Sequence, residues 1–189
     1  MIGRLRGVLV STRETGITIE VGGVGYDVAM TPKDLGALPG IGEEIVVHSH
    51  THVREDEISL YGFVSEHDRD LYRILLSASG VGPKVALAIL ASMSATDIIR
   101  AVNAEDPDAL TIAPGVGKRS AQKIVIELAP KLAGREAEVI SGVGFGGVRQ
   151  ALEGLGYSTA EINSVVVDLD PGETIESQVK RALQILGRQ

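Results

Sequence analysis

An internal repeat is the most informative feature of this chain. The segments Ser79–Ala86 and Pro114–Ala121 each contain Gly-Val-Gly between two apolar patterns with helical spacing. When the glycines are aligned, the match continues and places Ile89 opposite Ile124. Chance seldom produces such a match twice in register. The repeat therefore predicts two copies of one helix–turn–helix hairpin.

Each hairpin has the chemistry of a binding site for one phosphate group, which we call a phosphate seat. Glycine permits a positive φ and has no Cβ to obstruct a close approach. The helix that follows points free N–H groups and a partial positive charge outward. The alternative is an ordinary helical corner in which glycine ends a helix. Two copies in register, each followed by a lysine, favour the phosphate seat, with candidate residues Gly80, Gly82 and Lys84 in the first copy and Gly115, Gly117 and Lys118 in the second.

A nucleotide-binding P-loop is excluded by the spacing. That loop needs a glycine, four residues, and then Gly-Lys-Ser/Thr. Ile112 stands where the first glycine should be, and Arg119 replaces the hydroxyl residue that binds Mg²⁺. In the first copy, Pro83 separates the second glycine from the lysine. We therefore expect no ATP site and no cofactor.

The distribution of charge matters more than the net charge of −7. Residues 1–63 carry a net charge of −4 and residues 135–189 a net charge of −3, whereas residues 64–134 are neutral. Within this neutral third, basic residues concentrate at the second hairpin, where a single acid, Glu127, accompanies Lys118, Arg119, Lys123 and Lys131. Salt screens such fields within about 10 Å, so a local basic patch can bind an anion on an acidic protein.

Composition also bounds the compartment and the class of protein. The 189 residues include no cysteine, which excludes disulfides and thiolate metal sites. The first ten residues form a short apolar run interrupted by Arg4 and Arg6, too short and too charged for a signal peptide or a membrane span. We expect a cytoplasmic protein without a membrane segment.

Residues 1–63 have the pattern of a small β-barrel. Five β-rich runs are bounded by turn residues, and Thr31-Pro32 predicts a short helix. This order fits an OB-fold. OB-folds often stack single-stranded bases on aromatic side chains, but aromatics make up only 3% of this chain, which disfavours that use. The predicted strands are Ile2–Val10, Gly16–Val21, Val24–Met30, Glu44–Val53 and Ile58–Phe63.

Two features of the predicted barrel could carry chemistry. His48, His50 and His52 alternate, so they share one face of a strand; we interpret them as a solvated face, the alternative being a metal site. Glu55 and Asp56 lie between two strand patterns, at a predicted hairpin tip. This tip is either a plain solvated turn or a cluster of carboxylates that repels phosphate at one point.

The rest of the chain is predicted to be helical, with one interruption. Residues 64–133 contain the two hairpins, residues 134–147 are glycine-rich and predict a flexible linker, and residues 148–189 predict three short helices. A bundle this small cannot bury every apolar residue. Leu152, Leu155 and Tyr157 therefore either fill its core or form a docking surface for a partner.

Taken in order, several segments resemble the RuvA family of bacterial Holliday-junction-binding proteins. They cover nearly the whole chain, and their number makes the resemblance specific. They are Met-Ile-Gly-Arg-Leu-Arg-Gly at the start, Gly22–Tyr26, Val53–Asp56, Leu60–Phe63, Gly80–Lys84, Pro114–Lys118 and Leu152–Tyr157.

The resemblance implies an α+β multidomain protein with three parts: an OB-fold barrel with an acidic pin, a tandem helix-hairpin-helix domain, and a small three-helix, UBA-like domain. It implies a homotetramer, alone or paired into an octamer, that holds a four-way DNA junction open in recombination and repair. Glu55 and Asp56 would line its centre, while Lys84, Lys118, Arg119 and Lys123 would grip the phosphates of the arms.

The resemblance also implies partners. The tail would dock onto the hexameric RuvB ATPase, with the RuvC resolvase in a larger complex, and this chain would have no active site of its own. Two departures from the family pattern stand out. The linker is shorter than in long-linker members, and Lys123 replaces a frequent arginine, which keeps the charge but loses a bidentate phosphate contact.

Two rival functions remain open from the residues alone. A helix-hairpin-helix DNA glycosylase would need a nucleophilic lysine or a catalytic aspartate beside a base-sized pocket, and Lys118 or Lys123 could fill that role. The low aromatic content leaves little to stack a flipped base. The other rival is a module that binds any DNA duplex.

Overall fold

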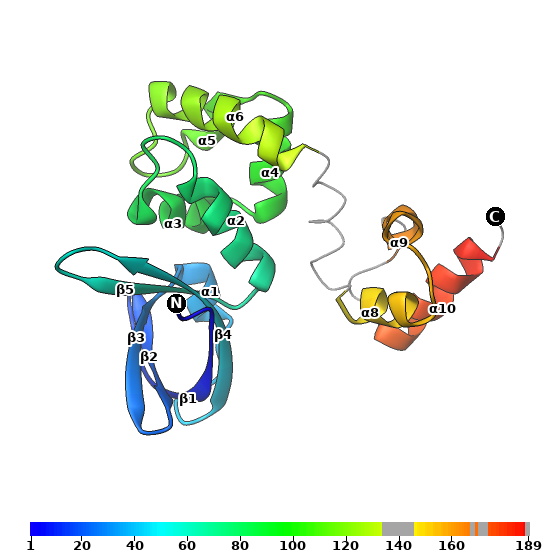
Figure 1. Ribbon diagram of the computed structural model, residues 1–189, viewed down its shortest axis with the longest axis horizontal. Helices are drawn as coiled ribbons and strands as arrows, with labels where there is room; N and C mark the ends of the chain where they lie inside the picture. The colour runs from blue at the N-terminus through cyan, green and yellow to red at the C-terminus, as the bar shows by residue number, and fades with distance from the viewer. Residues whose placement is uncertain (134–145, 167–168, 170–173, 188–189) are drawn as a thin grey trace. The chain divides into compact units, whose positions relative to one another are not determined.

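The computed structural model describes residues 1–133, 146–166, 169 and 174–187 (Figure 1). The chain forms two compact units, residues 1–131 and 132–189. In the described part, no single helix has both the length and the apolar character needed to cross a membrane. One pair of consecutive helices has them only when the two are taken together, and that pair is bent by 101°.

The first unit begins with a closed five-stranded barrel in the order β1-β2-β3-β5-β4 (Figure 1). All neighbouring strands are antiparallel except β3 and β5, which are parallel. The barrel core is aliphatic and includes Leu9, Ile17, Ile19 and Val47. The elements are β1 Arg4–Arg13, β2 Gly16–Val21, β3 Val24–Ala29, α1 Pro32–Gly36, β4 Glu44–Val53 and β5 Ile58–Phe63.

The predicted barrel is confirmed, and the bounds of β2, β4 and β5 match the prediction. The prediction for β1 was wrong at both ends. The strand continues to Arg13 because Ser11–Arg13 pair with Gly16–Thr18 across the β1–β2 turn, after an irregularity between Leu9 and Ser11. Cross-strand pairing, rather than apolar alternation, sets this end of the strand.

Five helices follow the barrel in the first unit, and four of them form the two predicted hairpins. The helix start predicted at Thr31-Pro32 is present, because the Thr31 side chain accepts a hydrogen bond from the Asp34 amide. Ser94 caps the later helix that begins at Ala95 in the same way, by accepting from the Asp97 amide. The first hairpin joins α2 to α3, and the second joins α5 to α6. The helices are α2 Glu66–Leu76, α3 Pro83–Ser92, α4 Ala95–Asn103, α5 Pro107–Leu110 and α6 Lys118–Leu132.

Helix α2 packs directly against strand β4. Tyr72 is fully buried, with its ring 5.5 Å from that of His50 and 5.0 Å from that of Phe63. The guanidinium groups of Arg69 and Arg73 also lie 3.5 Å from the carbonyl oxygens of Gly3 and Ser49. The strand that leads to the β4–β5 tip is therefore the same strand that supports the first hairpin.

The second unit contains three helices around a small apolar core. Val148, Ile162, Val165 and Ala182 are fully buried or nearly so. Ser158 and Glu161 form a capping box, because Ser158 donates to the Glu161 carboxylate over 2.6 Å and accepts from the Glu161 amide. The helices are α8 Gly146–Gly154, α9 Thr159–Val166 and α10 Ile175–Leu186. Most of the predicted linker 134–147 lies outside the described residues, and its last two residues belong to α8.

Candidate nucleic-acid interface

The two hairpins have matching backbone geometry. Gly80 and Gly115 have φ values of +82° and +85°. Each turn is closed by a 3.1 Å hydrogen bond from the valine between the glycines to an alanine carbonyl: Val81 to Ala78, and Val116 to Ala113. These φ values lie in the left-handed region, which explains why both copies have glycine there.

The second glycine of each copy has no such internal explanation. Gly82 has an extended backbone at the N-cap of α3, with φ −89° and ψ 174°. A Cβ added at Gly82 or at Gly117 would have no atom within 4 Å. Nothing within the unit therefore excludes a larger side chain at either position. An object outside the chain that approaches the backbone closely would account for both glycines.

Exposed cations stand beside these two turns. Lys84 lies in the first turn of α3, while Lys118, Arg119 and Lys123 lie in the first two turns of α6. All four residues are exposed, and Arg119 and Lys123 are four residues apart and so share one face of α6. Lys118 has an acidic neighbour, because its Nζ is 3.9 Å from Oδ1 of Asp108.

The other charged residues of α6 have a different role, which the sequence analysis missed. The carboxylate of Glu127 accepts a 2.7 Å hydrogen bond from the Ser79 amide, and Lys131 donates to Ser77 over 2.7 Å. These contacts join the second hairpin helix to the first turn. Because Glu127 is directed at this turn, the single acid in the basic segment serves a structural contact.

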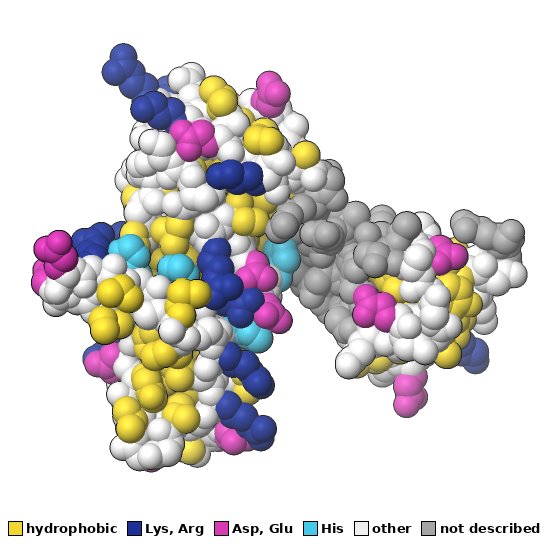
Figure 2. Space-filling model, in the orientation of Figure 1, with side chains coloured by type: hydrophobic (Ala, Val, Ile, Leu, Met, Phe, Trp, Pro, Cys, Tyr) yellow, Lys and Arg dark blue, Asp and Glu magenta, His cyan; other side chains and the backbone are white. Residues whose placement is uncertain are grey.

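The predicted acidic tip is present between β4 and β5. The Arg54 amide donates to the Glu57 carbonyl over 2.8 Å and closes the turn, which leaves Glu55 and Asp56 exposed between them. Figure 1 shows that this hairpin projects beyond the barrel, and Figure 2 shows acidic side chains gathered at its tip. The tip and both glycine turns belong to the same unit.

A groove of about 380 Å³ joins the base of this tip to the first glycine turn. Arg54 and Tyr61 line its barrel side, and Gly82 and Lys84 line its helical side. The Nε of Arg54 donates to Nε2 of His52 over 3.2 Å, which places the guanidinium beside the groove. Arg54 was not among the site residues predicted from the sequence, because the closeness of this hairpin to α3 follows from the packing of α2.

The prediction of a solvated histidine face was wrong. His48, His50 and His52 are half-buried, because α2 packs over this side of β4. Burial lowers the pKa of His48 and of His50, and Arg73 and His52 lower the pKa of His50 further. The alternative metal site gains no support, because no group of three or more potential ligands converges within the described residues.

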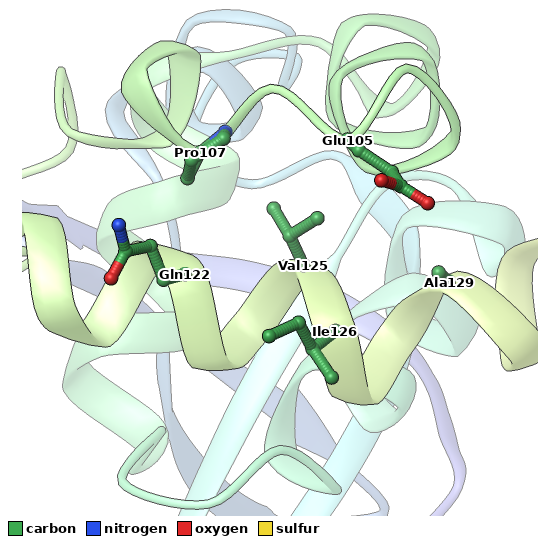
Figure 3. A pocket seen from close by; sticks show the side chains of 6 residues that line it. All are labelled: Glu105, Pro107, Gln122, Val125, Ile126 and Ala129. Atoms are coloured by element: carbon green, nitrogen blue, oxygen red, sulfur yellow. The ribbon is translucent and has the colours of Figure 1, made fainter.

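A second groove, of about 440 Å³, runs along α6 (Figure 3). Gln122, Ile126 and Ala129 project into it from one face of the helix, and Glu105 and Pro107 face them from the α4–α5 segment. Ile126 is 73% exposed. Ile126 lies three residues after Lys123 and seven after Arg119, so the groove borders the helix face that carries these two cations.

The structure separates the three candidate docking residues of the tail. Leu152 is fully buried in the core, so it cannot contact a partner while the tail is folded. Tyr157 is half-buried against the same core. Leu155 is 60% exposed and follows the end of α8. Of the two interpretations left open by the sequence, core packing holds for Leu152, and surface exposure holds for Leu155.

Comparison with known proteins agrees with this arrangement. Three family models match the chain in order: the RuvA N terminal domain over residues 1–62, a SAM-like helix-hairpin-helix tandem over residues 72–130, and the RuvA C-terminal domain over residues 148–187. The chain belongs to the RuvA family. The OB-like barrel, the tandem hairpins and the C-terminal domain inferred from the sequence are therefore confirmed.

Full-length relatives support the same conclusion. Proteins named Holliday junction branch migration complex subunit RuvA are similar to this RuvA-family chain over nearly all of both sequences. The protein from Rubrobacter xylanophilus is 40% identical, over 99% of this chain and 98% of the relative. The protein from Methylibium petroleiphilum is 37% identical over the whole of both, and that from Pseudomonas fluorescens is 35% identical over 97% and 98%.

Proposed function

We propose that this chain binds four-way DNA junctions and serves as the non-catalytic subunit of a branch migration complex. The observation that carries the proposal is the presence of two matching glycine turns with exposed cations in the same compact unit as a projecting acidic tip. The names of the full-length relatives support the assignment.

In this proposal, each glycine turn binds one phosphate. The open space over Gly82 and Gly117 admits a phosphate oxygen to the free N–H groups at the start of α3 and of α6. Lys84, Lys118, Arg119 and Lys123 then neutralise the charge. Contacts of this kind fix position on the duplex but carry no sequence information, so binding is independent of sequence.

The acidic tip supplies the preference for a junction. Four copies of the chain around one axis would bring eight carboxylates, from Glu55 and Asp56, to the centre. Bare repulsion between such charges and a phosphate amounts to several kcal/mol at moderate dielectric. A duplex that crosses the centre meets this repulsion, whereas an open junction leaves the centre empty. Figure 2 shows hydrophobic side chains gathered on the barrel surface, which is typical of a protein–protein interface. Two exposed barrel residues are Val8 at 41% and Val24 at 53%. We assign this surface to contacts between copies in the proposed homotetramer.

The tail is proposed to recruit the motor. Its exposed Leu155 offers an apolar contact for the hexameric RuvB ATPase, which would drive branch migration in the cytoplasm. A larger complex with the RuvC resolvase, and a second tetramer on the other face of the junction, belong to the same proposal.

One competition experiment tests the central claim. A labelled four-way junction bound to the full chain is challenged with unlabelled junction or with linear duplex of equal length and composition. We expect the junction to compete at a much lower concentration. If junction and duplex compete at the same concentration, the chain is a module that binds any DNA duplex. Release of a damaged base from duplex substrate would instead support the glycosylase alternative.

A further inference from the structure

The two hairpins differ in the charges around their otherwise matching turns. An offset of 35 residues aligns them, since Gly80 and Gly82 fall on Gly115 and Gly117. The same offset aligns Pro83 with Lys118, so the second seat has an additional cation at the first helical position. It also aligns Arg73 with Asp108, so the second hairpin has an acid where the first has a base. The additional acid and the additional cation are paired in the structure.

The backbone of α5 holds this acid next to the second seat. Asp106 caps α5 through a 3.2 Å hydrogen bond from the Ala109 amide, and the Thr111 hydroxyl donates to the Asp108 carbonyl over 2.7 Å. Figure 3 shows Pro107, the residue before Asp108, facing Gln122 in the first half of α6. The position of Asp108 is thus fixed, while the lysine opposite it has a flexible stem.

The contact itself is loose and accessible. Oδ1 of Asp108 lies 3.9 Å from Nζ of Lys118, and the two side chains are 77% and 83% exposed. Exposed ion pairs of this kind contribute little to folding. The ammonium group can therefore leave the carboxylate for another anion at small cost. The pair is poorly suited to a structural role and well suited to exchange.

We propose that Asp108 competes with the DNA backbone for Lys118 and so weakens the grip of the second hairpin. The inference rests on the proposed phosphate seat at Gly115–Lys118. A phosphate on Lys118 would lie within the screening length of about 8 Å from the Asp108 carboxylate, so the two anions repel each other while the phosphate is bound. This repulsion shortens the lifetime of the contact. A DNA arm that must advance over the protein during branch migration needs contacts that release quickly.

Asp108→Asn in the full chain tests the proposal, with junction affinity and dissociation rate measured at several salt concentrations. We expect the variant to bind the junction about two- to fivefold more tightly at low salt. The variant removes a repulsion that screening confines to short range, so it should act mostly on the dissociation rate of the bound DNA. The gain should shrink as salt rises. Glu14→Gln is the matched control, since it removes one exposed negative charge from the β1–β2 turn and should leave affinity unchanged. Asp108→Ser replaces the asparagine variant if the latter melts at a lower temperature.

Lys118→Ala and the double variant distinguish the possible failures. If Lys118→Ala does not weaken binding, the phosphate seat itself is wrong. If Lys118→Ala weakens binding but Asp108→Asn leaves affinity and dissociation unchanged, only the competition is overturned. If Asp108→Asn tightens binding equally with and without Lys118, the acid acts on DNA directly, and the proposed exchange is also overturned. Support requires that the gain be lost in the Lys118→Ala background.

Discussion

At the scale of single residues, the two glycines of each hairpin are present for different reasons. Gly80 needs a positive φ, whereas Gly82 has an ordinary backbone and open space where its side chain would be. The fold therefore requires glycine at position 80 but not at position 82, where the proposed phosphate contact supplies the reason. A pair of alanine variants can separate the two constraints in one hairpin.

We expect Gly82→Ala to fold normally and to lose junction affinity. Alanine suits the backbone at this position and should change the free energy of unfolding by less than about 1 kcal/mol in either direction. Its methyl group would occupy the space proposed for a phosphate oxygen. Gly80→Ala is the matched control, because a left-handed alanine costs about 1–2 kcal/mol of stability. Urea unfolding and junction titration measure both effects. Unchanged affinity in Gly82→Ala would place the DNA elsewhere.

Lys118→Ala and Lys123→Ala should each weaken binding to all sequences alike. Each lost phosphate contact should reduce the magnitude of the slope of log affinity against log salt by about 0.9 for duplex arms. Titrations of junctions of two unrelated sequences, at four salt concentrations, measure this. Lys180→Ala, an exposed lysine in α10, is the control. If the slope is unchanged in Lys118→Ala or in Lys123→Ala, the substituted lysine does not contact DNA.

At the scale of elements, the sequence predicted best where local signals decide the outcome. The bounds of β2, β4 and β5 follow from β-rich runs between turn residues, and the start of α1 follows from the cap at Thr31-Pro32. The half-buried histidines were missed because their environment depends on α2, which comes later in the chain. Arg54 was missed for the same reason. Hence the features that the sequence did not predict depend mostly on contacts between segments that are distant in the sequence.

The half-buried His50 predicts a pH dependence of stability. The pKa of His50 is lowered in the folded state, mainly by burial, so the folded chain disfavours its protonation. Its contribution to stability is fully present above the unfolded pKa of about 6.5 and is lost as the pH falls from that value through the lower pKa of the folded state. Urea unfolding at pH 7.5 and at pH 5.5 should show lower stability at the lower pH. His50→Gln should reduce that difference, and an equal difference in the variant would assign the effect to other groups.

The β4–β5 tip is an element whose charge, rather than its shape, is proposed to act. Glu55→Gln combined with Asp56→Asn should raise affinity for linear duplex and reduce the preference for junctions. The turn should persist, because its closing hydrogen bond is between the backbones of Arg54 and Glu57. Competition between junction and duplex measures the preference. If the neutral tip binds duplex no better than the parent chain, the tip is only a solvated turn.

At the scale of the whole molecule, the proposed function divides DNA binding and partner binding between the two units of the chain. Glycine turns, cations and acidic tip all lie in residues 1–131, whereas the exposed Leu155 lies in the second unit. Each unit has its own buried core. The sequence indicated this division through its glycine-rich segment but could not tell Leu152 from Leu155, because both are apolar and lie three residues apart on one helical pattern. Their burial depends on where α9 and α10 pack.

The tail is therefore expected to be dispensable for DNA binding and essential for recruitment. Truncation after Gly134 should leave junction affinity within a few-fold and abolish stimulation of the hexameric partner ATPase. Leu155→Asp in the full chain should behave in the same way, because a 60% exposed side chain can be replaced without loss of core packing. Leu152→Asp is the contrasting variant, since a charge at a fully buried position should unfold the tail, and circular dichroism distinguishes the two. If Leu155→Asp stimulated the ATPase as well as the parent chain does, the docking surface would lie elsewhere on the tail; if the truncated chain did so, it would lie in the first unit.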